Sequence, residues 1–284
     1  MVPSQHECRM NVLASPAGLP AQPSQFYTRA VAAVPRYPDL QPTSFRIARD
    51  VVRGARRPFA SDARALCQRL SPPLSLRQPP PPLDAAGNLI LANHYSRPGF
   101  RAWWIALAIS AVIPAEVHWM MTDAWTYSDA LRSRTLTPLW HWLFLRLCRV
   151  YGFTPTPPMP PRPWEVEQRA AAVRAVLRHI RRTSRPLVGL APEGADSGSG
   201  TLLPPPPGVG RFIGLMVAAG LMPIPVGVYE DQGGLCLHFG KPFPLPVEDS
   251  GPPDARDALV ARAVMQAIAA CLPPRLRGRF GQED

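Results

Sequence analysis

The chain has 284 residues, 38 of them proline, and its 31 basic and 20 acidic side chains give a formal net charge of +11. Hydrophobic residues make up 46% of it, enough to form a core, which excludes a wholly disordered protein. The five cysteines are far apart and form no CxxC pair, so neither a disulfide framework nor a bound metal is expected. A reducing compartment is therefore predicted.

The first 86 residues are predicted to form a Pro- and Arg-rich N-terminal arm. Residues 1 to about 42 are rich in Pro, Ser, Gln and Ala without a sustained hydrophobic period, as is typical of a mobile segment. Residues 44–57 place an apolar stripe beside four arginines, which predicts a basic amphipathic helix. Such a helix either lies on an anionic membrane surface or packs on the next domain with its arginines in water. The proline run at 79–82 predicts a spacer that ends near Ala86.

Alternating strands and helices are predicted after residue 86. The predicted strands are Asn88–Ala92, Val117–Met121, Leu187–Leu190, Ile224–Tyr229 and Leu235–Phe239. The predicted helices are Ala102–Ile113, Pro138–Arg149, Glu165–Arg182, Val209–Ala219 and Asp254–Cys271. This order predicts an α/β domain over residues 87–284, with a central mixed, largely parallel sheet flanked by helices.

Neither a membrane span nor a cleaved targeting segment is expected. The longest uncharged apolar stretch, Phe212–Tyr229, is interrupted by glycines and prolines, which favours a helix, a turn and a buried strand. Met1–Val34 lacks the basic start and the unbroken apolar run of a secretory signal.

Polar residues cluster directly after two of the predicted strands. The segment NHYSRPG at 93–99 follows the first strand, and APEGADSG at 191–198 follows the strand LVGL. In α/β sheets, sites are built at the carboxyl ends of strands. A neutral histidine there, His94, is suited to remove a proton from a hydroxyl, although a lone histidine is more often structural.

The order of these motifs resembles that of the glycerolipid acyltransferase family. NHYS after a strand is followed about a hundred residues later by PEG with a Ser/Gly loop, then by LLPPPPGVGRF and MPIPVGVY, over Asn88–Phe243. The resemblance implies an acyltransferase-like α/β fold, bound peripherally at the cytoplasmic face of a membrane. It also implies transfer of a fatty acyl group from acyl-CoA or acyl carrier protein to a hydroxyl of a lysophospholipid or related lipid. It implies no cofactor besides that co-substrate.

Carried over residue by residue, the resemblance makes His94 the general base and Glu193 a residue that positions the acceptor or His94. The residues then expected to bind substrate are Asn93, Ser96, Arg97, Gly194, Ser197 and Arg211. Two positions depart from the family pattern: Gly99 replaces the aspartate of the HxxxxD motif, and Asp196 replaces a phosphate-binding arginine. A neutral or cationic acceptor head is therefore favoured, unless the phosphate is bound by Arg97, Arg101 or Arg211.

Two functions remain open at this point. One is an active O-acyltransferase, in which the missing aspartate is replaced by Glu193, Asp123 or Asp129. The other, motivated by Gly99 and Asp196, is a catalytically degenerate acyltransferase-fold protein that binds lipid or a partner without turnover. Six of the seven tryptophans lie within residues 103–142, between the two motifs, and either line an acyl-chain groove, enter the lipid interface or pack in the core. No nucleic-acid partner is expected, because no recognition motif accompanies the basic charge.

Overall fold

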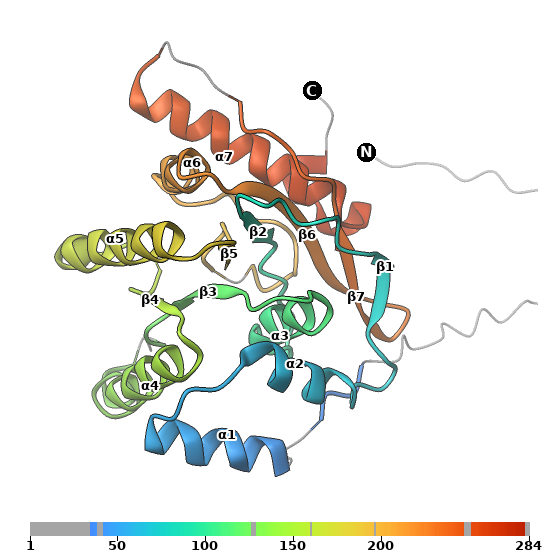
Figure 1. The fold of residues 1–284 in the computed structure, drawn as a ribbon, viewed down its shortest axis with the longest axis vertical. Coiled ribbons are helices and arrows are strands. Elements are labelled where there is room, and N and C mark those ends of the chain that lie inside the picture. Colours follow the sequence, from blue (N-terminus) through green and yellow to red (C-terminus); the bar gives the residue numbers. More distant parts are fainter. Residues whose placement is uncertain are drawn as a thin grey trace, which may run out of the picture. The chain divides into compact units, whose positions relative to one another are not determined.

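The computed structural model describes residues 35–38, 42–125, 129–159, 161–195, 197–246 and 251–281 (Figure 1). Residues 32–284 form one compact unit. Most of the segment predicted to be mobile, residues 1 to about 42, lies outside these ranges. Its described part is packed: Arg36 forms an antiparallel bridge with Ser71, and the Tyr37 ring lies 5.0 Å from the Trp104 ring.

A seven-stranded, mostly parallel sheet forms the core, which confirms the predicted α/β class. The order across it is β1 (Ser75–Gln78), β7 (Gly234–Phe239), β6 (Met222–Asp231), β2 (Asn88–Ala92), β5 (Leu187–Leu190), β3 (His118–Thr122) and β4 (Thr154–Thr156). The β6–β7 pair is antiparallel and the other neighbouring pairs are parallel. All residues of β2 and β5 are buried, as expected for strands covered on both faces.

Helices cover both faces of the sheet. They are α1 (Pro42–Arg53), α2 (Phe59–Cys67), α3 (Trp103–Val112), α4 (Ala130–Tyr151), α5 (Val166–Arg182), α6 (Val209–Ala218) and α7 (Pro253–Ala270). Figure 1 shows α5, α6 and α7 on one side and α1 to α4 on the other. The stretch Phe212–Tyr229 is a helix, a turn at Gly220 and a buried strand, as predicted. Among the described residues, no helix is both long and apolar enough to cross a membrane.

The predicted start of α4 at Pro138 was wrong. The helix begins at Ala130, because the Asp129 side chain caps it by accepting a hydrogen bond from the backbone N–H of Arg132 (2.9 Å). Pro138 lies inside the helix. The elements α2, β1 and β4 were not predicted at all.

The domain boundary predicted near Ala86 falls inside the compact unit. On its N-terminal side, α2 packs against α3 and contributes Phe59 and Ala63 to the core, and β1 pairs with β7. The proline run at 79–82 therefore connects two strands of one sheet. Its position on the surface explains why a spacer-like composition is tolerated there.

The start of α6 is held by a side chain of α7. The buried carboxylate of Asp257 accepts hydrogen bonds from the backbone N–H groups of Gly208 and Arg211, both at 2.7 Å. These bonds satisfy donors that a helix N-terminus leaves unpaired. Gly210 lets the two helices cross closely, since a Cβ there would lie under 3.0 Å from the Asp257 carbonyl oxygen.

Replacement of Gly210 by alanine is expected to lower the free energy of unfolding by about 1–3 kcal/mol, because the added methyl forces α6 and α7 apart. Gly214 provides a matched control on the same helix, where an added Cβ meets nothing within 4 Å. Gly214→Ala should be neutral or stabilising by up to roughly 1 kcal/mol. Urea unfolding followed by far-UV circular dichroism measures both, and equal effects would contradict the close crossing.

Candidate active site

The two sequence motifs meet at one edge of the sheet. Because β2 and β5 are parallel neighbours, with Leu91 opposite Leu190, the segments that follow them emerge side by side. The backbone N–H of His94 donates a hydrogen bond of 2.6 Å to Oε1 of Glu193, across 99 residues of sequence. The structure thus brings the predicted base and the predicted positioning carboxylate together. His94 itself is half-buried.

Glu193 is a buried carboxylate that joins three segments. Its residue is only 3% exposed, and its second oxygen, Oε2, accepts a hydrogen bond of 2.7 Å from the backbone N–H of Leu203. The neighbouring Leu202 donates its N–H to the carbonyl oxygen of Leu276, near the C-terminal end of the described chain (3.0 Å). A buried carboxylate is tolerated only when such donors surround it. Glu193 therefore acts on the backbone of the His94 segment and on the 197–203 loop.

The Asn93 side chain is hydrogen-bonded to the backbone of the sheet. Its side chain is buried, its Nδ2 donates to the carbonyl oxygen of Val228 (2.9 Å), and its Oδ1 accepts from the N–H of the same residue (2.7 Å). The amide thus imitates a backbone pair between β2 and β6 just after β2 ends. This fixes the direction in which the chain leaves the strand toward His94.

Arg97 forms a bidentate ion pair with Glu230, a residue of β6 that sequence reasoning missed. Its Nε donates to Oε2 and its Nη2 to Oε1, the latter at 2.7 Å. The hydroxyl groups of Tyr37 and Tyr95 donate to the same carboxylate, at 2.5 and 3.3 Å. The bond to Glu230 raises the pKa of Arg97, and burial raises the pKa of Tyr37. A substrate phosphate at Arg97 would have to displace Glu230.

A left-handed turn occupies the position of the missing aspartate. Gly99 has φ of +82°, a conformation that strains any residue with a Cβ. The 197–200 turn lies against the same loop, since a Cβ on Gly200 would come within 2.8 Å of the Ser96 carbonyl oxygen. Within the described part of the chain, the buried Oγ of Ser197 has no hydrogen-bond partner. Asp196 lies outside the described residues.

Gly194 and Arg211, two further predicted substrate-binding residues, lie in different surroundings. Gly194 has φ of +65° in the turn after β5, and its N–H donates to the carbonyl oxygen of Ala191 (3.2 Å). The Arg211 side chain is 54% exposed on α6, with Nη2 3.9 Å from Oδ1 of Asp254. Arg211 thus has its charge at the surface, whereas Gly194 shapes the turn next to Glu193.

The other candidate carboxylates have partners of their own. Asp129 is the cap of α4 and also lies 3.7 Å from the Arg132 guanidinium. Asp123 follows β3, where burial raises its pKa, and its Oδ2 lies 3.8 Å from Nδ1 of His141. Both carboxylates therefore interact with residues of α4.

The tryptophans divide between core and surface. Trp104 and Trp119 are buried, and the Trp119 indole N–H donates to the Ser110 hydroxyl (3.0 Å). Trp103 and Trp125, which stack at 6.4 Å, are 45% and 39% exposed, and Trp142 on α4 is 45% exposed. Core packing thus explains Trp104 and Trp119, whereas Trp103, Trp125 and Trp142 are partly open to solvent.

A cavity of about 750 Å³ lies at the opposite edge of the sheet, at the amino ends of β3 and β5. The stacked rings of His118 and His179, with centroids 3.8 Å apart, form part of its lining, and Nε2 of His118 lies 2.8 Å from the Thr154 hydroxyl. A second cavity of about 350 Å³ lies beside Asp123. Neither cavity is lined by His94 or Glu193.

No protein-family model matches this chain, and no curated protein is found to match it. Among the residues that the structure describes, no group of three or more His, Cys, Asp or Glu side chains is placed to hold a metal ion. The geometry of the sheet edge is therefore the basis for a functional assignment.

Replacement of Glu193 by glutamine is expected to lower the free energy of unfolding by about 1–3 kcal/mol, because the amide NH₂ group cannot accept from a backbone N–H. Glu167→Gln, which removes an exposed carboxylate from the first turn of α5, is the matched control and should change stability little. Chemical denaturation of both variants tests this. A glutamine variant at 193 as stable as the wild type would show that the carboxylate does not hold the loops.

The His118–His179 pair predicts a loss of stability in acid. Burial, with the charge of His179, lowers the pKa of His118 to about 4 from its ordinary 6.5. The unfolded chain thus binds this proton more tightly, and stability present above pH 6.5 is lost as the pH falls toward 4. When the pH falls from 7 to 5, the free energy of unfolding should decrease by about 2 kcal/mol more in the wild type than in His118→Gln. The exposed His141→Gln should retain the wild-type loss, and parallel pH profiles for wild type and His118→Gln would refute the prediction.

Proposed function

We propose that this protein is an O-acyltransferase that works at a membrane surface, with His94 as its general base. The hydrogen bond between the His94 backbone and the Glu193 carboxylate carries the proposal, since it joins the two motifs on which the family resemblance rests. His94 is half-buried, and the backbone of its loop is held by Glu193 at the carboxyl ends of parallel strands. A histidine in such a position suits proton transfer at a fixed place.

The chemistry requires one proton carrier and no covalent enzyme intermediate. The His94 imidazole takes the proton of the acceptor hydroxyl as its oxygen attacks the thioester carbonyl of acyl-CoA or acyl-ACP. The tetrahedral intermediate then collapses, the C–S bond breaks, and the leaving thiolate takes the proton from the imidazolium. The products are an ester and a free thiol. Glu193 is the positioning residue, because its bonds are to the backbone of His94 and of the loop at Leu203.

The electrostatics of the loop favour an acceptor that has no phosphate at Arg97. The Glu230 carboxylate neutralises that guanidinium and is itself held by two tyrosine hydroxyls. Arg101 lies over the Trp103 ring, with Cζ 5.2 Å from the ring centroid. We therefore propose a lipid hydroxyl on a neutral or cationic head as the acceptor.

Two neighbouring helices support work at a lipid surface. α1 packs beside α4, and both expose large apolar side chains, with Phe45 67%, Val52 64% and Leu131 75% exposed. The sequence of α4 contains four arginines and no acidic residue. Apolar groups beside cationic ones are the combination that binds anionic lipid at the cytoplasmic face of a membrane. This exposure favours the lipid-surface interpretation of the 44–57 segment.

A second candidate is a degenerate acyltransferase fold that binds lipid or a partner without turnover. The left-handed turn at Gly99 favours it, because no carboxylate stands at the motif position that would orient the base. Loss of an orienting carboxylate costs on the order of 10⁴ in rate in serine proteases.

Replacement of His94 by glutamine separates the two candidates. Purified full-length protein, incubated with a long-chain acyl-CoA or acyl-ACP and a panel of lyso-lipids, should release free thiol. The release should fall by about 10²-fold or more in His94→Gln, since the general base is removed. A thiol-reactive dye gives the rate, and mass spectrometry identifies the acylated product.

His238 lies in β7. The variant His238→Gln is the control and should retain the wild-type rate. Thermal unfolding must show that both variants are folded. Thiol release that persists in His94→Gln would refute the proposed base. Binding of lipid without thiol release by the wild type would instead establish the degenerate protein.

A further inference from the structure

Three arginines from separate segments line the cavity at the amino ends of β3 and β5. Arg56 follows α1, Arg149 lies in the last turn of α4, and Arg185 precedes β5. All three are exposed, and no described residue forms an ion pair with any of them. Their charges therefore meet in one cavity without an ion pair to a described carboxylate.

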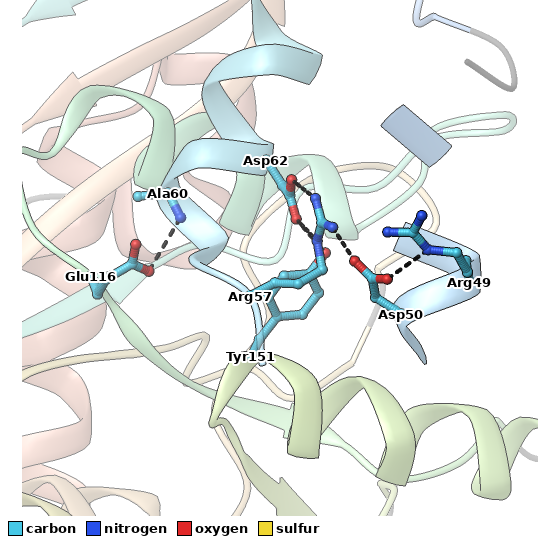
Figure 2. Close-up of polar contacts among 7 residues, drawn as sticks. All are labelled: Arg49, Asp50, Arg57, Ala60, Asp62, Glu116 and Tyr151. Carbon is cyan, nitrogen blue, oxygen red and sulfur yellow. Dashed lines mark hydrogen bonds and ion pairs between the residues drawn. The ribbon is translucent and has the colours of Figure 1, made fainter. Parts of the chain in front are cut away.

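Two acidic residues that contact the cavity lining, Asp50 and Asp62, are paired with another arginine. Figure 2 shows Arg57, a fourth arginine of the cavity lining, between Asp50 and Asp62. It bonds to Asp50 through Nη1 and to both oxygens of Asp62, at 2.5 and 2.7 Å. The Tyr151 hydroxyl also donates to Asp62 (3.0 Å). Arg57 thus uses these two carboxylates to join α1 and α2, and Asp50 also pairs with Arg49 (2.9 Å). Neither carboxylate forms an ion pair with the other three arginines of the lining.

One acidic residue, Glu116, lies in the cavity lining. Its Oε2 accepts a hydrogen bond of 3.2 Å from the backbone N–H of Ala60, in the first turn of α2 (Figure 2). This contact places the carboxylate at a helix N-terminus, where the dipole stabilises it. A single carboxylate cannot balance three guanidinium groups.

Helix dipoles offset only part of the positive charge of these arginines. The C-terminal ends of α4 and α5 face the cavity, and each carries about half a negative charge. Arg56 lies over the end of α4, since a Cβ on Gly152 would meet its Nη1 at 2.8 Å. Two helix ends offset about one charge in total and Glu116 offsets another, so about one of the three positive charges remains. The excess is what a bound anion would neutralise.

The rest of the lining gives the cavity an apolar wall. Val117, Leu145, Phe153 and Leu187 belong to it, beside the stacked His118 and His179 rings. A volume of about 750 Å³ lies within the range of small-molecule sites, roughly 300–1,000 Å³. A ligand with anionic oxygens and an apolar or aromatic body would match both parts of the lining. Guanidinium groups bind phosphate oxygens with charge-assisted hydrogen bonds, often two at a time.

We propose that this cavity binds a phosphate group carried on an apolar or aromatic body, held by Arg56, Arg149 and Arg185. The phosphate belongs either to a soluble molecule such as a nucleotide or to a lipid head group. The site lies at the opposite edge of the sheet from His94, so that its occupation does not depend on the proposed acyl transfer.

Binding to full-length protein tests the site. The soluble probes are pyrophosphate and ADP, measured by isothermal titration calorimetry. The lipid probe is phosphatidylcholine vesicles with and without phosphatidate, measured by co-sedimentation. Arg56→Gln, Arg149→Gln and Arg185→Gln should each weaken binding about tenfold or more, as expected when one charge-assisted hydrogen bond is lost. Arg174→Gln removes the same charge from the exposed surface of α5, outside the cavity, and should bind like the wild type.

The outcomes separate the two sources of phosphate. Binding of ADP or pyrophosphate that the three variants weaken identifies a soluble ligand. Phosphatidate-dependent sedimentation that they weaken, without binding of soluble probes, identifies a lipid head group. Binding of neither probe, or equal weakening by Arg174→Gln, overturns the proposal. His94→Gln should bind like the wild type, so the result is independent of the acyltransferase assay.

Discussion

The carboxylate of Glu193 is the interaction on which the candidate site depends. It receives one hydrogen bond from the His94 segment and one from the loop at Leu203, and it is almost fully buried. Without these donors an ionised carboxylate would be too costly at this position, and without the carboxylate the two loops would have no common anchor. The parallel pairing of β2 and β5 brings the segments to one edge, and Glu193 fixes their separation.

The distribution of charge gives the two sheet edges different chemical characters. At the His94 edge, Glu230 neutralises Arg97, so the site is polar but has little net charge there. At the other edge, Arg57 uses Asp50 and Asp62, and its neighbouring arginines keep their charge. Part of the net charge of +11 is therefore concentrated away from the proposed chemistry. A ligand that carries both an acyl thioester and a phosphate therefore need not bind at both edges of the sheet at the same time.

Sequence patterns predicted the central elements well and their polar partners poorly. β2 and β5 were found with the right bounds because continuous apolar runs end at turn residues. α2 was missed because it has nine residues and no side-chain N-cap, and β1 because all but its first residue is exposed. The expectation that Glu193 positions the acceptor or His94 came from the family resemblance, and the pairing of β2 with β5, which brings the two residues together, is known only from the structure. The pairing of Arg97 with Glu230 joins residues 133 apart in the sequence and depends on how far β6 extends past the end of β2. A local sequence pattern cannot predict that length.

The bond from Leu202 to Leu276 has a consequence for the order of assembly during synthesis. The 197–203 loop leaves the ribosome well before its partner, which lies beyond α7. The loop over Glu193 can therefore make its full set of hydrogen bonds only after α7 and the turn that follows it have been made. A chain cleaved before Pro274 would still contain His94, Glu193 and the central strands, yet would lack one of the hydrogen bonds that hold this loop in place.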